Sequence, residues 1–219
     1  MNDKLLANYI RYCERELKEP LAACLLEHTK DAMQATGTMP EMLVQRMGEQ
    51  VYVLLFTCVI EDFMTRPAAP DGVNTTDAFL KRNGWKMTPS ARRSMHAIRD
   101  SVMGFYKIIK VNPGAGIVLQ DLLVEQPEIV IDHRGLADVL PVGASIGARV
   151  LRSEGYANIS EGFLPVDPDK SGVALEALRA AAGIGEEKIS AKDLPALAPH
   201  ISNVWLKLVL EDETSEAGQ

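Results

Sequence analysis

The sequence predicts an α+β protein in which a small five-stranded antiparallel barrel-like sheet lies between helical segments. Two patterns support this class. Residues 105–168 are rich in β-branched and aromatic side chains and are broken by closely spaced turn residues, as in a run of short strands. The flanking segments instead repeat apolar residues three and four positions apart, which is typical of amphipathic helices. Five such strands fit an SH3-like or an OB-like barrel, and the sequence does not distinguish the two.

A helical N-terminal part is expected over residues 1–66. Pro20 fits the first turn of the second helix, where its missing N–H costs nothing, and Gly37 ends the segment that follows. The next helical segment has a break near Gly48. Its stretch VYVLLFTCVI, residues 51–60, is apolar all round, which predicts the central buried helix of this part.

Residues 67–74 are the predicted linker, because this stretch combines prolines and a glycine within a few residues. Connecting helices are expected over residues 75–102. Thr75 or Thr76 is positioned to cap the first of them, and Thr88, followed by a proline, is positioned to cap the second.

The small β-barrel module is expected over residues 103–168, with strands in FYKIIKV, GIVLQDLL, EIVID, SIGARVL and YANISEGFLPV. C-terminal helices follow over residues 169–210, the first capped by Ser171 and ended by Gly183. The acidic tail, residues 211–219, cannot bury apolar surface and is expected to be disordered.

The spacing of the cysteines and the length of the apolar stretches predict the cellular location of the protein. Cys13, Cys24 and Cys58 lack the spacing of a zinc or redox motif and fall in helical segments, so we expect buried thiols and no cofactor. The N-terminus lacks the continuous apolar core of a secretory signal, and the longest apolar stretch is too short to span a bilayer. A cytoplasmic protein without membrane contact is expected.

The charge is unevenly distributed along the chain. The whole chain carries -7, but the segment from Lys81 to Lys110 has eight basic residues against Asp100 and is therefore +7, which leaves -14 for the rest. The basic segment can pair internally with the acidic body, or it can form an anion-binding patch. The candidate binding residues come from two neighbouring segments: three lie three or four positions apart on the expected helix, and two lie on the strand that follows it. This basic flank comprises Arg92, His96, Arg99, Lys107 and Lys110.

Three motifs with catalytic or metal-binding associations lack the required context. Ser145 lies in a G-x-S-x-G sequence, but a strand and not a helix is expected after it. The turn at residues 113–116 lacks the lysine and hydroxyl residue of a phosphate-binding loop. Asp132 and His133 point to opposite faces of a strand, which opposes joint action. No catalytic residue and no metal site are predicted.

Residues 94–178 carry a recognisable order of segments: SMHAIRDSVMGFYKIIKVNPGAG, GIVLQDLL, EIVID, LPVGASIGARV and YANISEGFLPV. This order resembles an uncharacterised bacterial family with a helical N-terminal part and a small β-barrel module, similar to proteins that elsewhere carry a SEC-C zinc tail. The resemblance implies the same architecture and a non-enzymatic role. The chain has no cysteine after Cys58, so the zinc tail is not carried over.

We therefore expect a non-enzymatic binding or adaptor protein that docks an acidic protein or an anionic ligand through the basic flank. Nucleic-acid binding is one alternative, because Trp85, Phe105 and Tyr106 lie within the basic segment and could stack on bases. The acidic remainder of the chain would repel a polyanion. A hydrolase that uses Ser145 is the other alternative. The identity of the partner and the oligomeric state are not predicted.

Overall fold

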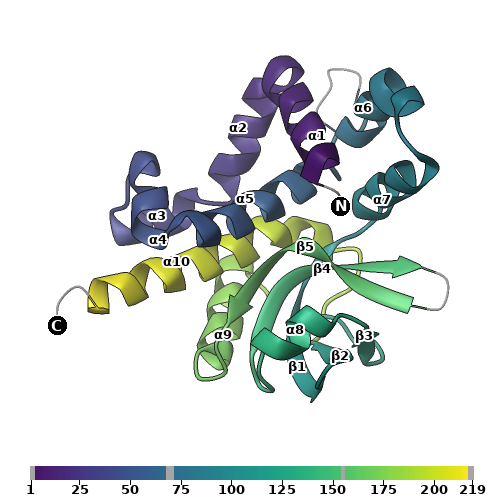
Figure 1. Ribbon diagram of the computed structural model, residues 1–219. Coiled ribbons are helices and arrows are strands. Elements are labelled where there is room, and N and C mark those ends of the chain that lie inside the picture. The colour runs from purple at the N-terminus through teal and green to yellow at the C-terminus, as the bar shows by residue number, and fades with distance from the viewer. Residues whose placement is uncertain (1–2, 68–71, 154–155, 217–219) are drawn as a thin grey trace.

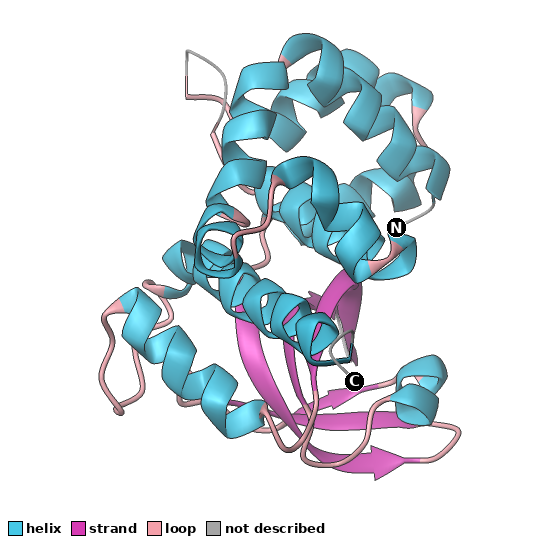
Figure 2. Ribbon diagram, turned by 90° about the vertical axis from the view of Figure 1, so that its left-hand side faces the viewer, coloured by secondary structure: helices cyan, strands magenta, loops and turns pink. Residues whose placement is uncertain are grey.

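The computed structural model describes residues 3–67, 72–153 and 156–216, and it confirms the α+β class. Helices from both ends of the chain form a layer over one side of a closed five-stranded barrel (Figures 1 and 2). No helix within these ranges is both long and apolar enough to cross a membrane.

The helices and strands follow one another along the chain with these bounds: α1 (Asp3–Glu16), α2 (Lys18–Glu27), α3 (Lys30–Thr36), η1 (Pro40–Met42), α4 (Leu43–Met47), α5 (Glu49–Phe63), α6 (Thr75–Asn83), η2 (Gly84–Lys86), α7 (Pro89–Arg99), β1 (Met103–Asn112), β2 (Gly116–Asp121), β3 (Ile129–Ile131), α8 (Arg134–Val139), β4 (Ser145–Ser153), β5 (Tyr156–Val166), α9 (Ser171–Ala182), η3 (Leu194–Leu197) and α10 (Ala198–Glu216).

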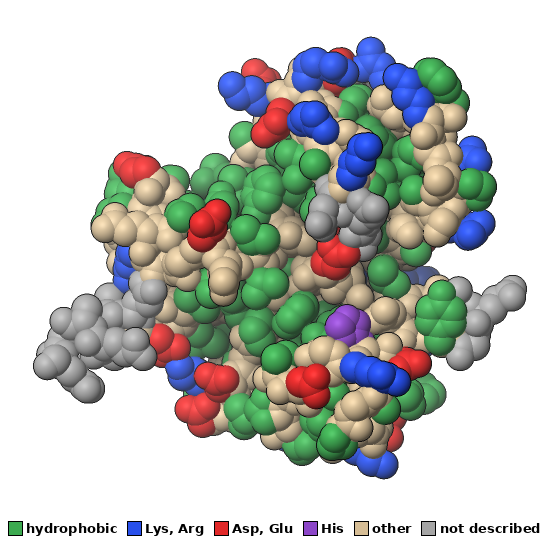
Figure 3. Space-filling model, viewed as in Figure 1, with side chains coloured by type: hydrophobic (Ala, Val, Ile, Leu, Met, Phe, Trp, Pro, Cys, Tyr) green, Lys and Arg blue, Asp and Glu red, His purple; other side chains and the backbone are tan. Residues whose placement is uncertain are grey.

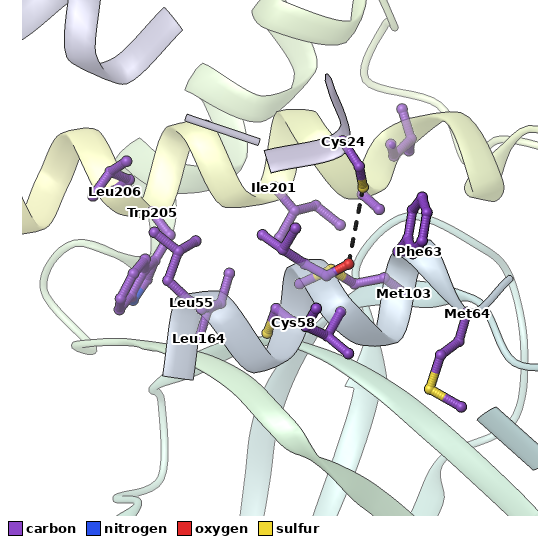
Figure 4. Packing of buried hydrophobic residues seen from close by; sticks show 14 of the residues in the cluster. Cys24, Leu55, Cys58, Phe63, Met64, Met103, Leu164, Ile201, Trp205 and Leu206 are labelled. Atoms are coloured by element: carbon purple, nitrogen blue, oxygen red, sulfur yellow. Dashed lines mark hydrogen bonds between the residues drawn. The ribbon is translucent and has the colours of Figure 1, made fainter. Parts of the chain in front are cut away.

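Helix α5 is the centre of the molecule, as its all-round apolar sequence predicts. The predicted break lies at Gly48, whose φ of 76° separates α4 from α5. The C-terminal half of α5 is buried between the other helices and β5. Figure 4 shows Leu55, Cys58 and Phe63 of this helix packed with residues of α10 and the barrel.

Most predicted helix ends are confirmed, and two capping assignments are wrong. Gly37 and Gly183 are left-handed C-caps, and Thr88 Oγ accepts a hydrogen bond from the amide of the third residue of α7. The N-cap of α6 is Asn74, not either threonine. Ser171 is the first residue of α9, after the N-cap Lys170, and its hydroxyl donates to the carbonyl of Asp167.

Thr75 and Thr76 do not cap α6, because their hydroxyls are used elsewhere. They donate at 2.7 and 2.8 Å to the carbonyls of Phe63 and Met64, the last residues of α5 and its cap. The ends of the predicted linker are also paired, since Pro67 and Asn74 form an isolated antiparallel bridge. Residues 68–71 of that linker lie outside the described part of the chain.

The barrel strands follow the closed order β1-β2-β3-β5-β4. All neighbours are antiparallel except β3 and β5, which pair in parallel at Ile131 and Ala157. A closed ring with an odd number of strands cannot alternate direction throughout, so the predicted purely antiparallel sheet could not close. The Greek-key order, with α8 between β3 and β4, is that of an OB-like barrel rather than an SH3-like one. Helix α8 replaces a predicted turn.

Two apolar cores hold this arrangement together. One fills the barrel and includes Ile108, Ile117, Leu119 and Ile146. The other, larger core lies between the helices and the outer face of the barrel and extends from α1 to α10. It contains barrel residues such as Met103 and Leu164 together with residues of α5 and α10, as Figure 4 shows. The β-module is therefore docked on the helices and shares their core.

Helix α10 extends further than predicted. It runs to Glu216 and so includes residues 211–216 of the predicted disordered tail. Residues 217–219 lie outside the described part of the chain.

Candidate ligand-binding site

The structure does not bring the predicted basic flank together. Arg92, His96 and Arg99 lie on α7, whereas Lys107 and Lys110 lie further along β1. A strand rises about 3.3 Å per residue, so Lys110 stands roughly 20 Å along β1 from the end nearest α7. The two lysines are exposed, but they belong to a different region of the surface.

Part of the basic charge is consumed by internal ion pairs. Arg99 Nη1 lies 2.6 Å from Asp77, and its Nε lies 2.7 Å from Asp100. Arg82 Nη1 lies 2.8 Å from Glu16. On the face seen in Figure 3, Lys and Arg side chains gather over the upper helices α1, α2, α6 and α7. For Arg82 and Arg99, the interpretation of internal pairing is confirmed.

An open cavity of about 570 Å³ lies between α7 and the β4–β5 hairpin, and we call it the α7 cavity. Its basic residues are Arg93 and His96 from α7 and Arg152 from β4. The complete lining comprises Ser90, Arg93, Ser94, His96, Ala97, Ile98, Leu151, Arg152, Tyr156 and Asn158. No carboxylate belongs to this lining, which contains described residues only.

The basic groups of the α7 cavity are not neutralised by acidic partners within the described ranges. Arg93 has no ion pair there, and Arg152 Nη2 donates to the neutral amide oxygen of Gln126 at 2.9 Å. The Nδ1 atom of His96 is buried and has no hydrogen-bond partner among the described residues. The α7 cavity is therefore a concave cationic surface, and His96 is the only predicted site residue in its described lining.

A second cavity of about 340 Å³ adjoins the first and shares Ile98, Leu151 and Asn158 with it. We call it the Glu61 cavity, after the carboxyl group that α5 contributes. Its lining comprises Glu61, Ile98, His133, Leu136, Leu151, Asn158, Ile159, Ser160, Glu161 and Phe163. Neither lysine nor arginine is among the described residues of this lining.

Glu61 is buried with only 1% of its surface exposed, and its two oxygens differ. Oε1 accepts a hydrogen bond from the Gly162 amide at 3.3 Å, whereas Oε2 has no partner in the described part of the chain. Burial raises the pKa of the Glu61 carboxyl to about 7, although Ser160, Arg149 and the Gly162 amide each lower it. Loss of hydration is the dominant effect, because burial penalises the charged form.

A buried polar network lies on the other side of α5, around Asp62. His28 Nε2 lies 3.2 Å from Asp62 Oδ2, and His28 Nδ1 lies 2.8 Å from Ser202 Oγ. Arg149 Nη2 and Arg66 Nε donate to the Asp62 carboxylate at 2.5 and 2.6 Å. Burial opposes ionisation, but the hydrogen bond with His28 and the charges of Arg149 and Arg66 hold the pKa of Asp62 at about 2.

The order serine, histidine, aspartate in this network does not make it a nucleophilic site. Ser202 and His28 are fully buried, so no substrate reaches the hydroxyl. Cys24 also has its sulfur within 4.8 Å of ligand atoms of His28 and Asp62, which would give a cation three ligands. The two guanidinium groups on Asp62 already neutralise its charge and would repel a metal ion. The network joins α2, α5, α10 and β4, and its role is structural.

Glu61, Asp62 and Arg149 were not predicted from the sequence as important polar residues. Each is a charged residue next to or within an apolar run, VYVLLFTCVIEDF in α5 or SIGARVL in β4. Such residues are almost never fully buried without a partner, so their position in buried segments was the available signal. The sequence does not show which residues are their partners, since the partners lie on segments distant in sequence.

The residues of the other sequence motifs, Ser145, Asp132 and His133, do not form a catalytic site. Ser145 is fully buried, and its hydroxyl has no hydrogen-bond partner among the described residues, so the hydrolase alternative gains no support there. His133 Nδ1 accepts from the Leu136 amide at 3.3 Å and caps α8, while its neighbour Asp132 is exposed. Of these residues, only His133 lines a described cavity.

The aromatic residues that motivated the nucleic-acid alternative are mostly inaccessible. Phe105 and Tyr106 are 3% and 4% exposed, so they cannot stack on bases. Trp85 is 78% exposed, with the Lys86 ammonium 4.8 Å from its ring centroid. The outward positions of β2 and β3 carry Gln120 and Val130 instead of aromatic side chains. The face that OB folds use for single strands therefore lacks a stacking platform here.

Comparison with known proteins does not add a family or an activity to this geometry. No protein-family model matches the chain, and no curated protein or solved structure is significantly similar to it.

Proposed function

We propose that this protein is a non-enzymatic binding protein that holds an anionic ligand in the α7 cavity. The observation that carries the proposal is the charge of the lining, to which Arg93, His96 and Arg152 contribute and no carboxylate does. A guanidinium group binds carboxylate or phosphate oxygens through two parallel N–H groups. Two arginines that lack acidic partners among the described residues, and that line the same cavity from α7 and β4, suit an anion held between these elements.

The shape of the site favours a small ligand. Its volume of about 570 Å³ lies within the range of small-molecule pockets, and a broad acidic protein surface would not enter it. Ser90, Ser94 and Asn158 add polar groups that can orient the ligand. Tyr156, which is 63% exposed, adds an aromatic face at the edge of the site.

Of the basic flank expected to bind the ligand, only His96 lines the α7 cavity. Arg99 is occupied by Asp77 and Asp100, and Lys107 and Lys110 lie elsewhere on the barrel. An acidic segment of a partner protein is the second candidate occupant. It is favoured by the exposed basic surface that continues outside the cavity on α7 and η2, where Arg92 and Lys86 lie.

Calorimetric titration of the full chain with inorganic pyrophosphate tests the proposal, and an oligoglutamate peptide serves as the competing probe. The double variant Arg93→Glu and Arg152→Glu is expected to weaken pyrophosphate binding by about tenfold or more, since both guanidinium partners become carboxylates. The matched control is Lys18→Glu with Lys30→Glu. It changes the net charge equally at exposed positions outside the cavity and should bind as the wild type does.

The possible outcomes separate the candidates. Preference for pyrophosphate, lost only in the arginine variant, supports a small anionic ligand. If the protein prefers the peptide, and this binding depends on Arg93 and Arg152 in the same way, the ligand is an acidic protein segment and not a small anion. Equal loss in both double variants would show general charge attraction only, and the proposed site would be rejected.

A further inference from the structure

We infer that the Glu61 cavity is a second binding site, which takes an organic ammonium group carried on a small apolar body. The inference goes beyond the anion site and stands without it. The Glu61 carboxylate is the proposed acceptor, and the apolar body would lie against the hydrophobic part of the lining. That part comprises Ile98, Leu136, Leu151, Ile159 and Phe163.

The unpartnered oxygen of Glu61 points to a missing hydrogen-bond donor. A buried acceptor without a partner is destabilising, because it has lost its hydration without replacing it, so buried polar groups are normally satisfied. The Gly162 amide reaches Oε1 only, and the neighbouring Ser160 hydroxyl donates to the carbonyl of Gly162 at 3.2 Å. Glu61 therefore keeps an acceptor position open beside a cavity that it lines.

The buried carboxyl group of Glu61 favours a cation. Neither lysine nor arginine is among the described residues of the lining. Arg149 lowers the pKa of Glu61, but it is not in the lining, and its guanidinium donates to Asp62 at 2.5 Å and to the carbonyl of Ser101 at 3.0 Å. An ammonium group in the cavity would meet carboxylate oxygen at one end and apolar side chains along its body, as in typical ligand pockets.

The close approach of β5 to α5 fixes the position of this carboxylate. A Cβ atom on Gly162 would lie 2.8 Å from the Cys58 nitrogen and 2.9 Å from Glu61 Oε2. Glycine at this position therefore lets the strand backbone contact the helix and donate its amide to Glu61. The acceptor is held on rigid secondary structure, which limits the reorganisation needed for binding.

Titration of the full chain with benzylamine, followed by two-dimensional ¹H–¹⁵N NMR, tests the inference. Saturable shifts of the Gly162 and Ser160 amide signals are expected, because both residues adjoin the Glu61 carboxyl. Benzyl alcohol and phenylacetate have similar apolar bodies without the cation and should bind about tenfold more weakly or worse. This selectivity is measured on the wild-type protein and does not depend on a folded variant.

The variant Glu61→Gln removes the charge and nearly preserves the shape of the side chain. It is expected to weaken benzylamine binding by about tenfold or more, whereas the exposed control Glu176→Gln should leave it unchanged. Benzylamine binding should persist in the Arg93→Glu and Arg152→Glu variant, so failure of the anion site and failure of this site are distinguishable. Absence of saturable shifts at Gly162, equal affinity for the three probes, or unchanged binding in Glu61→Gln would overturn the inference.

Discussion

Arg149 of β4 and Asp62 of α5 form a buried ion pair that joins the barrel to the helical layer. Nη2 of Arg149 donates to Oδ1 of Asp62 at 2.5 Å, and the two side chains are only 3% and 4% exposed. Arg149 also donates to the Ser101 carbonyl between α7 and β1. One side chain thus connects three parts of the chain that come together only on folding.

Replacing Arg149 by Met should destabilise the protein strongly. The substitution leaves Asp62 buried without its closest cation, and removal of one partner of a buried pair typically costs about 3–5 kcal/mol. The free energy of unfolding, measured by urea denaturation, reports this loss. The control Arg82→Met breaks an exposed pair with Glu16, and its effect should be small because solvent screens that pair. Comparable effects of the two substitutions would contradict the structural role given to Arg149.

The stability contribution of Glu61 should depend on pH. Its pKa is about 7 in the folded protein against an ordinary value of 4.5, so the folded state binds the proton more tightly between these values. The contribution is fully present below about pH 4.5 and is lost as pH rises through about 7. Each pKa unit corresponds to about 1.4 kcal/mol, which limits the loss to about 3 kcal/mol.

Urea unfolding of the wild type and of Glu61→Gln at pH 5 and pH 8 checks this dependence. The wild type should lose stability relative to the variant on going to the higher pH, because glutamine does not titrate. Histidine titration affects both proteins equally and cancels in the comparison. Parallel pH profiles of the two proteins would show that Glu61 has an ordinary pKa.

Gly162→Ala should destabilise the contact between β5 and α5. The added methyl group would lie 2.8 Å from the Cys58 nitrogen and 3.0 Å from its Cα, and overpacking of this kind typically costs about 1–3 kcal/mol. Gly172→Ala is the matched control, since a Cβ there meets nothing within 4 Å at the start of α9. The control should be neutral or slightly stabilising, because alanine favours the helix. Equal thermal unfolding midpoints of the two variants would argue against the close packing of β5.

The three cysteine thiols should be unreactive in the folded protein. Burial raises the pKa of Cys13 and Cys24 to about 12 and that of Cys58 well above its ordinary value, so thiolate is scarce near neutral pH. A chromogenic disulfide reagent at pH 8 should therefore react slowly with the native chain and promptly with all three thiols in urea. A fast-reacting thiol in the native protein would show that one of these sites is open.

Local sequence patterns determined the class and most elements of this protein. Apolar periodicity predicted the helices, and β-branched and aromatic runs between turn residues predicted the five strands. Gly37, Gly48, Thr88 and Gly183 marked helix boundaries because their backbone or capping preferences act over a few residues. Helix α8 was missed because a short HRGLADV segment has too few residues to show a period. The buried thiols were likewise expected from residue type and helical position alone.

The tertiary structure decided which charges are available and where the cavities lie. It paired Arg99 with Asp77, separated Lys107 from α7, and brought Arg152 and Arg93 into the lining of one cavity, although these residues are distant in sequence. Ion pairing and cavity formation depend on contacts between elements, which the spacing of residues along the chain does not encode. Residue type determined that the segment around α7 is basic, and only the packed chain determined which of its cations can meet a ligand.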